Sequence, residues 1–289
     1  MHALRFVAAG LAFGVLAAGA GRPASSAETL RLVHLSDVHA SRVDRNPSPR
    51  FLADPMVKDL VHSLEILDGA VDWINTRLRP ALVVITGDLV DRGDDLESLK
   101  EVKARLDRLT CPYYPVIGDH DRRATYEKVF PGKLDYAFDH RGWHFVCLNA
   151  NSGRLEPETL EWLKADLSAS QGRPSVVMLH RPLASDVLSD YLAARLYGGV
   201  HLTLENAAQA RSLLQSHPDV RLVLSGHTHV AKEQRWGGTC YSTAPALVVA
   251  PHWVRVVELS EGGVSSELVS VFPAMGGGRQ AKEVEPPKP

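Results

Sequence analysis

The stretch ALVVITGDLVDRG, from Ala81 to Gly93, decides the fold. Its first part, residues 82–85, is a continuous run of branched apolar side chains, which is typical of a β-strand buried on both faces. Gly87 follows this run, and a glycine lets the backbone turn sharply and approach a ligand closely. The pattern therefore places the carboxylate of Asp88 at the carboxyl end of a central strand, the edge at which open α/β sheets bind ligands.

Apolar strands and helices alternate on both sides of this stretch, which indicates an α/β fold. Further strands are predicted at residues 30–35, 113–117, 175–179 and 220–224, with an antiparallel pair at 134–138 and 143–149. Helices are predicted at residues 60–78, 96–109, 157–167 and 205–217. Short strands around turns at 237–238 and 261–263 are expected to complete a sheet. His34 lies in the apolar part of its strand and is predicted to be a core histidine.

Aspartate and histidine side chains follow these strands at the point where each strand ends. They occur in the segments Asp37-x-His39, Gly87-Asp88, Gly118-Asp119-His120-Asp121, His180 and Gly226-His227-x-His229. Carboxylate oxygen and imidazole nitrogen together suit Mn, Fe or Zn. The pattern of a strand, a glycine and an aspartate occurs at two strand ends, which is far less expected by chance than either occurrence alone. The two imidazoles after Gly226 have little structural purpose and form the most specific short signal.

Taken in order, these segments resemble the motifs of the calcineurin-like metallophosphoesterases, which are DxH, GDxxD, GNH(D/E), a lone His and GHxH. The resemblance covers nearly all of residues 30–260 and is most similar in detail to the class III cyclic-nucleotide phosphodiesterase branch and its exported relatives. It implies two packed mixed β-sheets flanked by helices. It also implies hydrolysis of a phosphate ester, with a phosphodiester expected and a broad-range phosphomonoesterase as the alternative.

The resemblance further implies two metal ions (Mn, Fe or Zn) that share one carboxylate. One ion would take Asp37, His39, His229 and the shared Asp88, and the other would take Asp88, Asp119, His180 and His227. Two cations bridged by a carboxylate and a hydroxide lower the pKa of water, clamp phosphoryl oxygens and neutralise charge in the transition state.

Four further residues are expected beside the metals. His120 cannot easily be a ligand if Asp119 is one, and the resemblance implies that it donates a proton to the leaving oxygen or steadies the phosphoryl group. Asp91 is expected to orient His120, and Arg92 is a candidate phosphate clamp. The alternative for both is a surface turn with a local ion pair. Asp121 is expected either to pair with His120 or to cap nearby backbone.

One position departs from the family pattern, because Asp119 stands where the family has asparagine. Aspartate adds a negative charge and removes an N–H donor, so it repels an anionic substrate. We expect a slower site or a changed metal preference. The alternative is a protein that holds metal without turnover.

Residues 1–27 have the pattern of a secretory signal. Arg5 precedes an apolar stretch at residues 6–20, and Ser25 and Ala27 occupy the −3 and −1 positions of a cut after Ala27. A cut after Ala20 and an uncleaved anchor are the alternatives. We expect an exported protein, periplasmic or secreted, with no stable membrane span after processing. An exported site makes intracellular cyclic nucleotides an awkward substrate, so nucleotide-like or envelope-derived diesters are equally plausible.

The rest of the chain divides simply. Residues 28–272 are expected to form one metallophosphoesterase domain, and residues 273–289 a disordered tail. Within the domain, residues 42–54 are expected to line the mouth of the site, and residues 185–204 to form a lid or specificity insertion.

The composition limits the partners. A formal net charge of −2 gives no indication of a basic surface for nucleic acid, so the expected partner is a small phosphate ester. Cys111, Cys147 and Cys240 are predicted to be buried small hydrophobes rather than a disulfide plus a thiol.

Overall fold

The computed structural model describes residues 29–44, 58–184 and 202–272. The predictions for residues 1–27 and 273–289 lie outside these described residues, as do most of the mouth loop and nearly all of the lid segment. Among the helices that the structure describes, none combines the length and apolarity needed to cross a membrane.

Two mixed β-sheets form the centre of the molecule. The first has the order β11-β10-β1-β2-β3, in which β1, β2 and β3 are parallel. Its strands are β1 (Leu30–Leu35), β2 (Leu82–Ile85), β3 (Tyr113–Pro115), β10 (Trp253–Ser260) and β11 (Gly263–Ser270). The second has the order β4-β5-β6-β7-β9-β8, in which β5, β6, β7 and β9 are parallel. Its strands are β4 (Tyr136–His140), β5 (Trp143–Cys147), β6 (Ser175–Met178), β7 (Val220–Ser225), β8 (Lys232–Trp236) and β9 (Thr239–Thr243).

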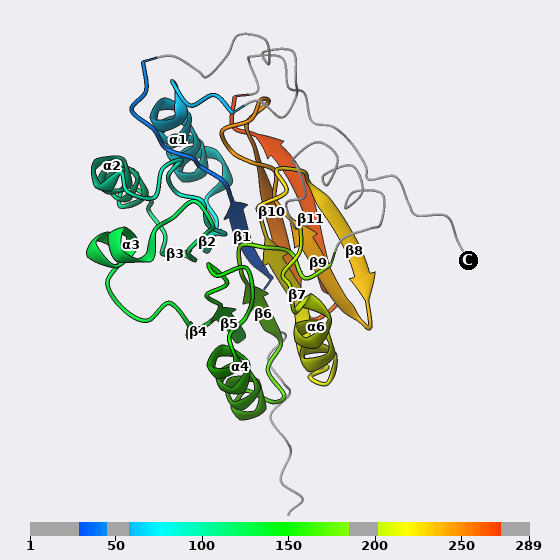
Figure 1. Cartoon of the computed structure of the whole chain (residues 1–289). Coiled ribbons are helices and arrows are strands. Elements are labelled where there is room, and N and C mark those ends of the chain that lie inside the picture. Colours follow the sequence, from blue (N-terminus) through cyan, green and yellow to red (C-terminus); the bar gives the residue numbers. More distant parts are fainter. Residues whose placement is uncertain (1–28, 45–57, 185–201, 273–289) are drawn as a thin grey trace, which may run out of the picture.

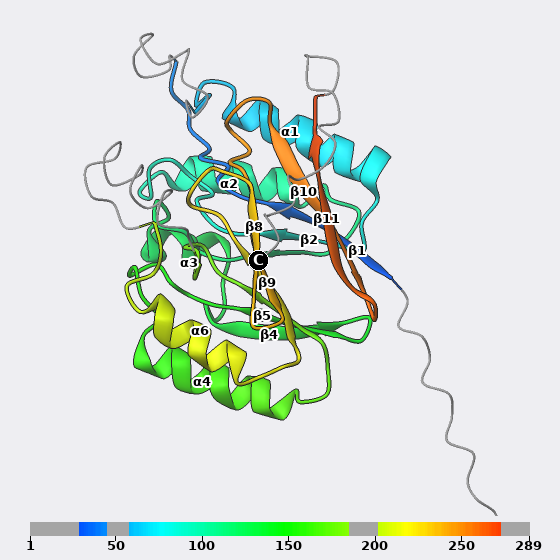
Figure 2. The ribbon, with the colours of Figure 1, turned by 90° about the vertical axis from the view of Figure 1, so that its right-hand side faces the viewer.

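Helices cover the outer faces of both sheets, as the two views in Figures 1 and 2 show. Against the five-stranded sheet pack α1 (Ser63–Trp73), α2 (Leu96–Leu106) and α3 (Arg123–Val129). Against the six-stranded sheet pack α4 (Pro157–Ala169) and α6 (Ala207–Gln215). This arrangement confirms the predicted fold of two packed mixed sheets flanked by helices.

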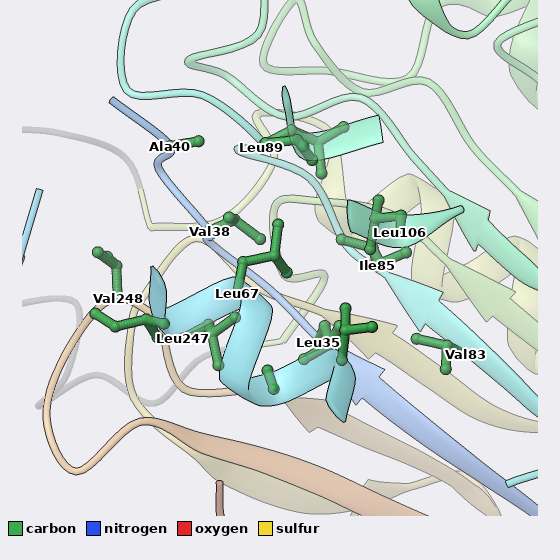
Figure 3. Packing of buried hydrophobic residues seen from close by; sticks show 14 of the residues in the cluster. Leu35, Val38, Ala40, Leu67, Val83, Ile85, Leu89, Leu106, Leu247 and Val248 are labelled. Carbon is green, nitrogen blue, oxygen red and sulfur yellow. The ribbon is translucent and has the colours of Figure 1, made fainter. Parts of the chain in front are cut away.

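Three apolar clusters correspond to these layers. In β2, Val83 and Ile85 face the helices of the first sheet, where Leu67 of α1 and Leu106 of α2 pack around them (Figure 3). Leu82 and Val84 point the other way, into the cluster that joins the two sheets. The third cluster lies beneath α4 and α6. The continuous apolar run is thus explained, because successive side chains of a strand point to opposite faces and both faces of β2 are buried.

The structure differs from the sequence-based expectations at several element ends. The predicted helix 60–78 is α1 followed by a π-helical turn, η2 (Ile74–Leu78), and α3 was not predicted. The late strands complete both sheets rather than one, because β8 and β9 join the second sheet while β10 and β11 join the first.

His34 is fully buried, as predicted. Cys147 and Cys240 are buried and Cys111 is half-buried, each as a thiol.

Candidate metal centre

The site lies where the carboxyl ends of the parallel strands of both sheets meet. Backbone hydrogen bonds hold the loops after β1 and β2 together, with Asp37 N donating to Gly87 O over 3.1 Å and His39 N donating to Asp88 O over 2.9 Å. Gly226 N donates to His180 O over 2.9 Å and joins the loops after β6 and β7. Backbone pairing therefore holds together the motifs that follow neighbouring strands of each sheet.

Three glycines permit this close approach. A Cβ built on Gly118 would overlap the backbone N and Oδ1 of Asp88, and one built on Gly226 would overlap Ser36 Oγ. Gly87 is equally confined and has a φ of +90°, with Gly118 Cα 2.7 Å from where its Cβ would be. Any side chain at these positions would push the candidate ligands apart.

Five of the candidate ligands have a left-handed backbone, which is uncommon for residues other than glycine. Their φ values are 53° for Asp37, 43° for His39, 52° for Asp88, 68° for His227 and 60° for His229. Such conformations cost of the order of 1 kcal/mol each and cluster at functional sites, where the surrounding structure holds them in place. The left-handed backbone ends the regular strand geometry at these residues, so their side chains belong to the loops that form the site.

The first group of candidate ligands consists of Asp37, His39 and His229. His229 Nε2 lies 3.3 Å from Asp37 Oδ1 and 3.2 Å from His39 Nε2. Asp37 and His39 are fully buried. Two imidazole nitrogens and a carboxylate oxygen thus converge on one place.

The second group consists of Asp119, His180 and His227. Asp88 contacts a histidine of each group. His227 Nδ1 is 3.3 Å from Asp119 Oδ2. Asp88 Oδ2 is 3.3 Å from His180 Nε2 and 3.6 Å from His39 Nε2. Asp88 therefore reaches both groups with the same oxygen, as a shared ligand would.

Burial and charge set the protonation of these groups in opposite directions. Burial lowers the pKa of both His39 and His227 to about 4, so both rings are neutral at pH 7. Burial also opposes protonation of His180, but the carboxylates of Asp88, Asp37 and Asp119 outweigh it and raise the pKa of His180 to about 10. The protonated His180 ring thus balances part of the negative charge of these carboxylates when no metal cation does so.

A chain of hydrogen bonds fixes Asp37 from behind. His34 Nε2 and Thr86 Oγ1 are 2.8 Å apart, Thr86 Oγ1 donates to Ser36 Oγ over 2.8 Å, and Ser36 Oγ donates to Asp37 Oδ2. Oδ2 is thus engaged, and Oδ1 is turned toward His229. In a similar way, His180 Nδ1 donates to Thr86 O over 2.6 Å, which leaves Nε2 on the side of Asp88.

Asp91 lies behind the site, with its carboxylate closer to His39 than to His120, whose Nδ1 is 3.9 Å from Asp91 Oδ1. Asp91 Oδ1 is 3.5 Å from His39 Nδ1, and Lys58 Nζ lies 3.2 Å from that oxygen and 3.1 Å from that nitrogen. The expected contact to His120 is made by the backbone, since His120 Nδ1 donates to Asp91 O over 2.7 Å. His120 itself is 41% exposed and packs edge-on against the His39 ring. Any proton exchange by His120 must therefore use Nε2.

The structure separates the remaining candidates from the ligand groups. The Arg92 side chain is 73% exposed and lies 3.5 Å from Asp94, at the surface, as in the alternative of a surface turn. Asp121 is buried and accepts hydrogen bonds from the backbone N–H groups of Gly118, Leu89 and Val90. Of its two expected roles, Asp121 therefore has that of a cap for nearby backbone. Burial raises its pKa to about 6.

Sequence reasoning missed three residues around the site. Arg181 Nε donates to Asp119 Oδ2 over 2.6 Å. Asn151 Nδ2 donates to the carbonyls of Gly118 and Asp121 and ties down the loop between β3 and α3. Lys58 lies behind His39, as described above. The position of Arg181 directly after a candidate ligand was the one available signal, whereas Asn151 and Lys58 lie in segments without a motif.

Unpaired buried polar atoms indicate, independently of any sequence motif, that these residues suit metal ions. Asp37 Oδ1, Asp119 Oδ1 and His180 Nε2 are buried without a hydrogen-bond partner in the described part of the chain. Buried polar atoms are normally paired, and an orphaned atom requires an explanation. Cations held among these atoms would satisfy all three, and carboxylate oxygens with imidazole nitrogens are suitable ligands.

Comparisons with known proteins identify the family of the chain. Residues 30–231 match the family described as calcineurin-like phosphoesterase. The chain is 27% identical to a probable cyclic nucleotide phosphodiesterase of Synechococcus sp., over 78% of this chain and 84% of that protein. It is also 27% identical to a cAMP/cGMP dual specificity phosphodiesterase of Mycobacterium tuberculosis, over 84% and 76%. A glycerophosphodiester phosphodiesterase of Enterobacter lignolyticus is 24% identical over 75% and 77%.

A solved structure shares the fold. The structure of a dimetal phosphatase from Danio rerio has a TM-score of 0.63 at 16% identity and covers 86% of this chain and 100% of that one. The family match covers most of the chain, and the fold agrees with it. The chain belongs to the calcineurin-like metallophosphoesterase family.

Proposed function

We propose that the protein hydrolyses a phosphodiester at a dinuclear metal centre bridged by Asp88. The observation that carries this proposal is the position of Asp88 Oδ2, within 3.6 Å of His39 Nε2 on one side and 3.3 Å of His180 Nε2 on the other. One cation would be held by Asp37, His39, His229 and Asp88, and the other by Asp88, Asp119, His180 and His227. When bound, two divalent metals supply an acidified water as nucleophile and neutralise phosphoryl charge.

The residues of the chain prepare this site in three ways. The neutral rings of His39 and His227 offer lone pairs at pH 7, because burial keeps their pKa values low. The hydrogen-bond chain from His34 holds Asp37, and the carbonyl of Thr86 holds His180. His120 is placed to exchange a proton with the leaving oxygen through Nε2, since Nδ1 is bonded to Asp91 O.

The names of the relatives favour a diester over a monoester. Cyclic nucleotide phosphodiesterases and a glycerophosphodiester phosphodiesterase all act, by name, on phosphodiesters. Purified protein with added Mn²⁺ should therefore turn over bis-p-nitrophenyl phosphate with a higher kcat/KM than p-nitrophenyl phosphate. A preference for the monoester would favour a phosphomonoesterase instead.

The alternative of a metal-holding protein without turnover rests on Asp119. The pairing of Asp119 with Arg181 opposes that alternative, because the guanidinium offsets the charge that would repel the substrate. Two metals per chain with no hydrolysis of either ester would support the alternative.

We also infer export, from the sequence pattern of residues 1–27 alone. Fractionation of cells that express the full chain tests this inference. Protein in the periplasm or medium, shortened by a cut after Ala27, is expected, and full-length protein in the cytoplasm would contradict it.

A further inference from the structure

Arg181 and Asp119 form a shielded ion pair at the position where the family motif has asparagine. Arg181 Nε lies 2.6 Å from Asp119 Oδ2, and the two side chains are only 18% and 16% exposed. Charges shielded from water interact more strongly than charges at the surface. The pair is therefore part of the electrostatics of the site rather than a surface contact.

The fold places Arg181 as firmly as it places the candidate ligands. Arg181 directly follows His180, so the end of β6 supplies both a candidate ligand and the guanidinium. The guanidinium lies beside the turn at Gly153, where an added Cβ would be 3.5 Å from Arg181 Nη1. The same loop contains Asn151, which binds the backbone on both sides of Asp119 and His120.

The pair changes both the charge and the geometry of this ligand position. Aspartate in place of asparagine adds one negative charge, and Arg181 adds one positive charge. Asp119 Oδ2 is engaged by Arg181 and lies 3.3 Å from His227 Nδ1, whereas Oδ1 is buried with no hydrogen-bond partner among the described residues. The carboxylate is thereby held with one oxygen occupied and the other left for a cation.

We propose that Arg181 is a positioning residue that neutralises Asp119 and fixes its carboxylate, so that the pair replaces the neutral asparagine of the family. This inference rests on the proposed function of the site. It follows that loss of Arg181 alone should leave an extra negative charge beside the bound phosphoryl group, and that a second change of Asp119 to asparagine should remove that charge.

The test compares wild type with Arg181→Gln, Asp119→Asn and the double variant, each loaded with Mn²⁺. Calorimetric titration with inorganic phosphate gives an affinity that does not depend on turnover, and elemental analysis gives the metal content. Arg181→Gln should weaken phosphate binding about tenfold, and the double variant should return to within about threefold of wild type. The KM for bis-p-nitrophenyl phosphate should rise with Arg181→Gln more than kcat falls.

Arg123→Gln on α3 is the matched control. It removes the same charge from a 65% exposed side chain that pairs with Glu127, and it should change neither phosphate affinity nor KM. Arg181→Lys keeps the charge and should stay within about threefold of wild type. If Arg181→Gln does not fold, Arg181→Lys replaces it in the test. A tenfold loss of phosphate affinity in Arg181→Lys would then overturn the proposal.

Other outcomes are equally decisive. Unchanged phosphate affinity in Arg181→Gln would overturn the proposal, and a double variant as weak as Arg181→Gln would show that the guanidinium acts on phosphate directly. In both cases the wild type would still bind metal and turn over the ester. A wild type without metal and turnover would instead refute the proposed function.

Discussion

Asp88 Oδ2 lies 3.3 Å from His180 Nε2, although the two residues follow strands of different sheets. The contact depends on Gly87, which has a φ of +90° and lies so close to His180 that an added Cβ would be 2.8 Å from Nδ1. The meeting of the two sheets at this glycine creates the site.

Replacement of Asp88 by alanine should abolish binding at both candidate metal positions. Loss of a ligand shared by two cations leaves each cation without one negatively charged oxygen, so turnover should fall by roughly a thousandfold or more. Elemental analysis and ester turnover measure both effects. Asp94→Ala, which removes an exposed carboxylate nearby, is the control and should behave like wild type. Full metal content in Asp88→Ala would refute its bridging role.

Gly226→Ala should damage the site through packing alone. Its Cβ would overlap Ser36 Oγ and lie 2.5 Å from Asp37 Oδ2, so the loops after β1 and β7 must separate. Overpacking of this kind costs about 2 kcal/mol of unfolding free energy, and the metal content should also fall. In Gly262→Ala, where the nearest atom is 3.6 Å from the added Cβ, stability and metal content should stay unchanged.

Asp121→Asn should lower the unfolding free energy in urea by about 2 kcal/mol. The Asp121 carboxylate accepts from three backbone N–H groups through both oxygens, and an amide would turn an NH₂ group toward at least one of these donors. Asp72→Asn, at a 65% exposed carboxylate of α1, should change stability far less. Equal effects of the two changes would contradict the capping role of Asp121.

His34 should make the fold sensitive to acid. Burial, followed by the charge of Arg255, lowers the pKa of His34 to about 3. Between pH 6.5 and 3 the unfolded chain therefore binds a proton that the folded chain does not. Stability should fall by about 1.4 kcal/mol per pH unit as the pH decreases through that window.

Urea unfolding of wild type and His34→Gln at pH 7.5, 6 and 5 measures this effect. His39 and His227 also have lowered pKa values and contribute to the pH dependence of both proteins. The contribution of His34 is therefore the difference in unfolding free energy between wild type and His34→Gln. The wild-type curve should be steeper below pH 6.5. Parallel curves would contradict it.

Local patterns indicated an α/β fold and the strand ends at which the candidate ligands lie, whereas the two packed sheets were implied by the family resemblance. Runs such as residues 82–85 report burial on both faces, and glycine followed by aspartate or histidine reports a strand end. Contacts that depend on loop conformation were not predictable in this way. Asp91 meets His120 through a backbone carbonyl, while its carboxylate meets His39 and Lys58. Pairing of Asp119 with Arg181 depends on where the ends of β3 and β6 lie in space.

The most direct test of the central claim is elemental analysis of the purified protein, with turnover of bis-p-nitrophenyl phosphate measured on the same sample. We predict two metal ions per chain together with turnover, because Asp88 Oδ2 lies near His39 Nε2 of one candidate ligand group and near His180 Nε2 of the other. A protein that holds no metal after exposure to Mn²⁺, Fe²⁺ and Zn²⁺ would contradict the claim.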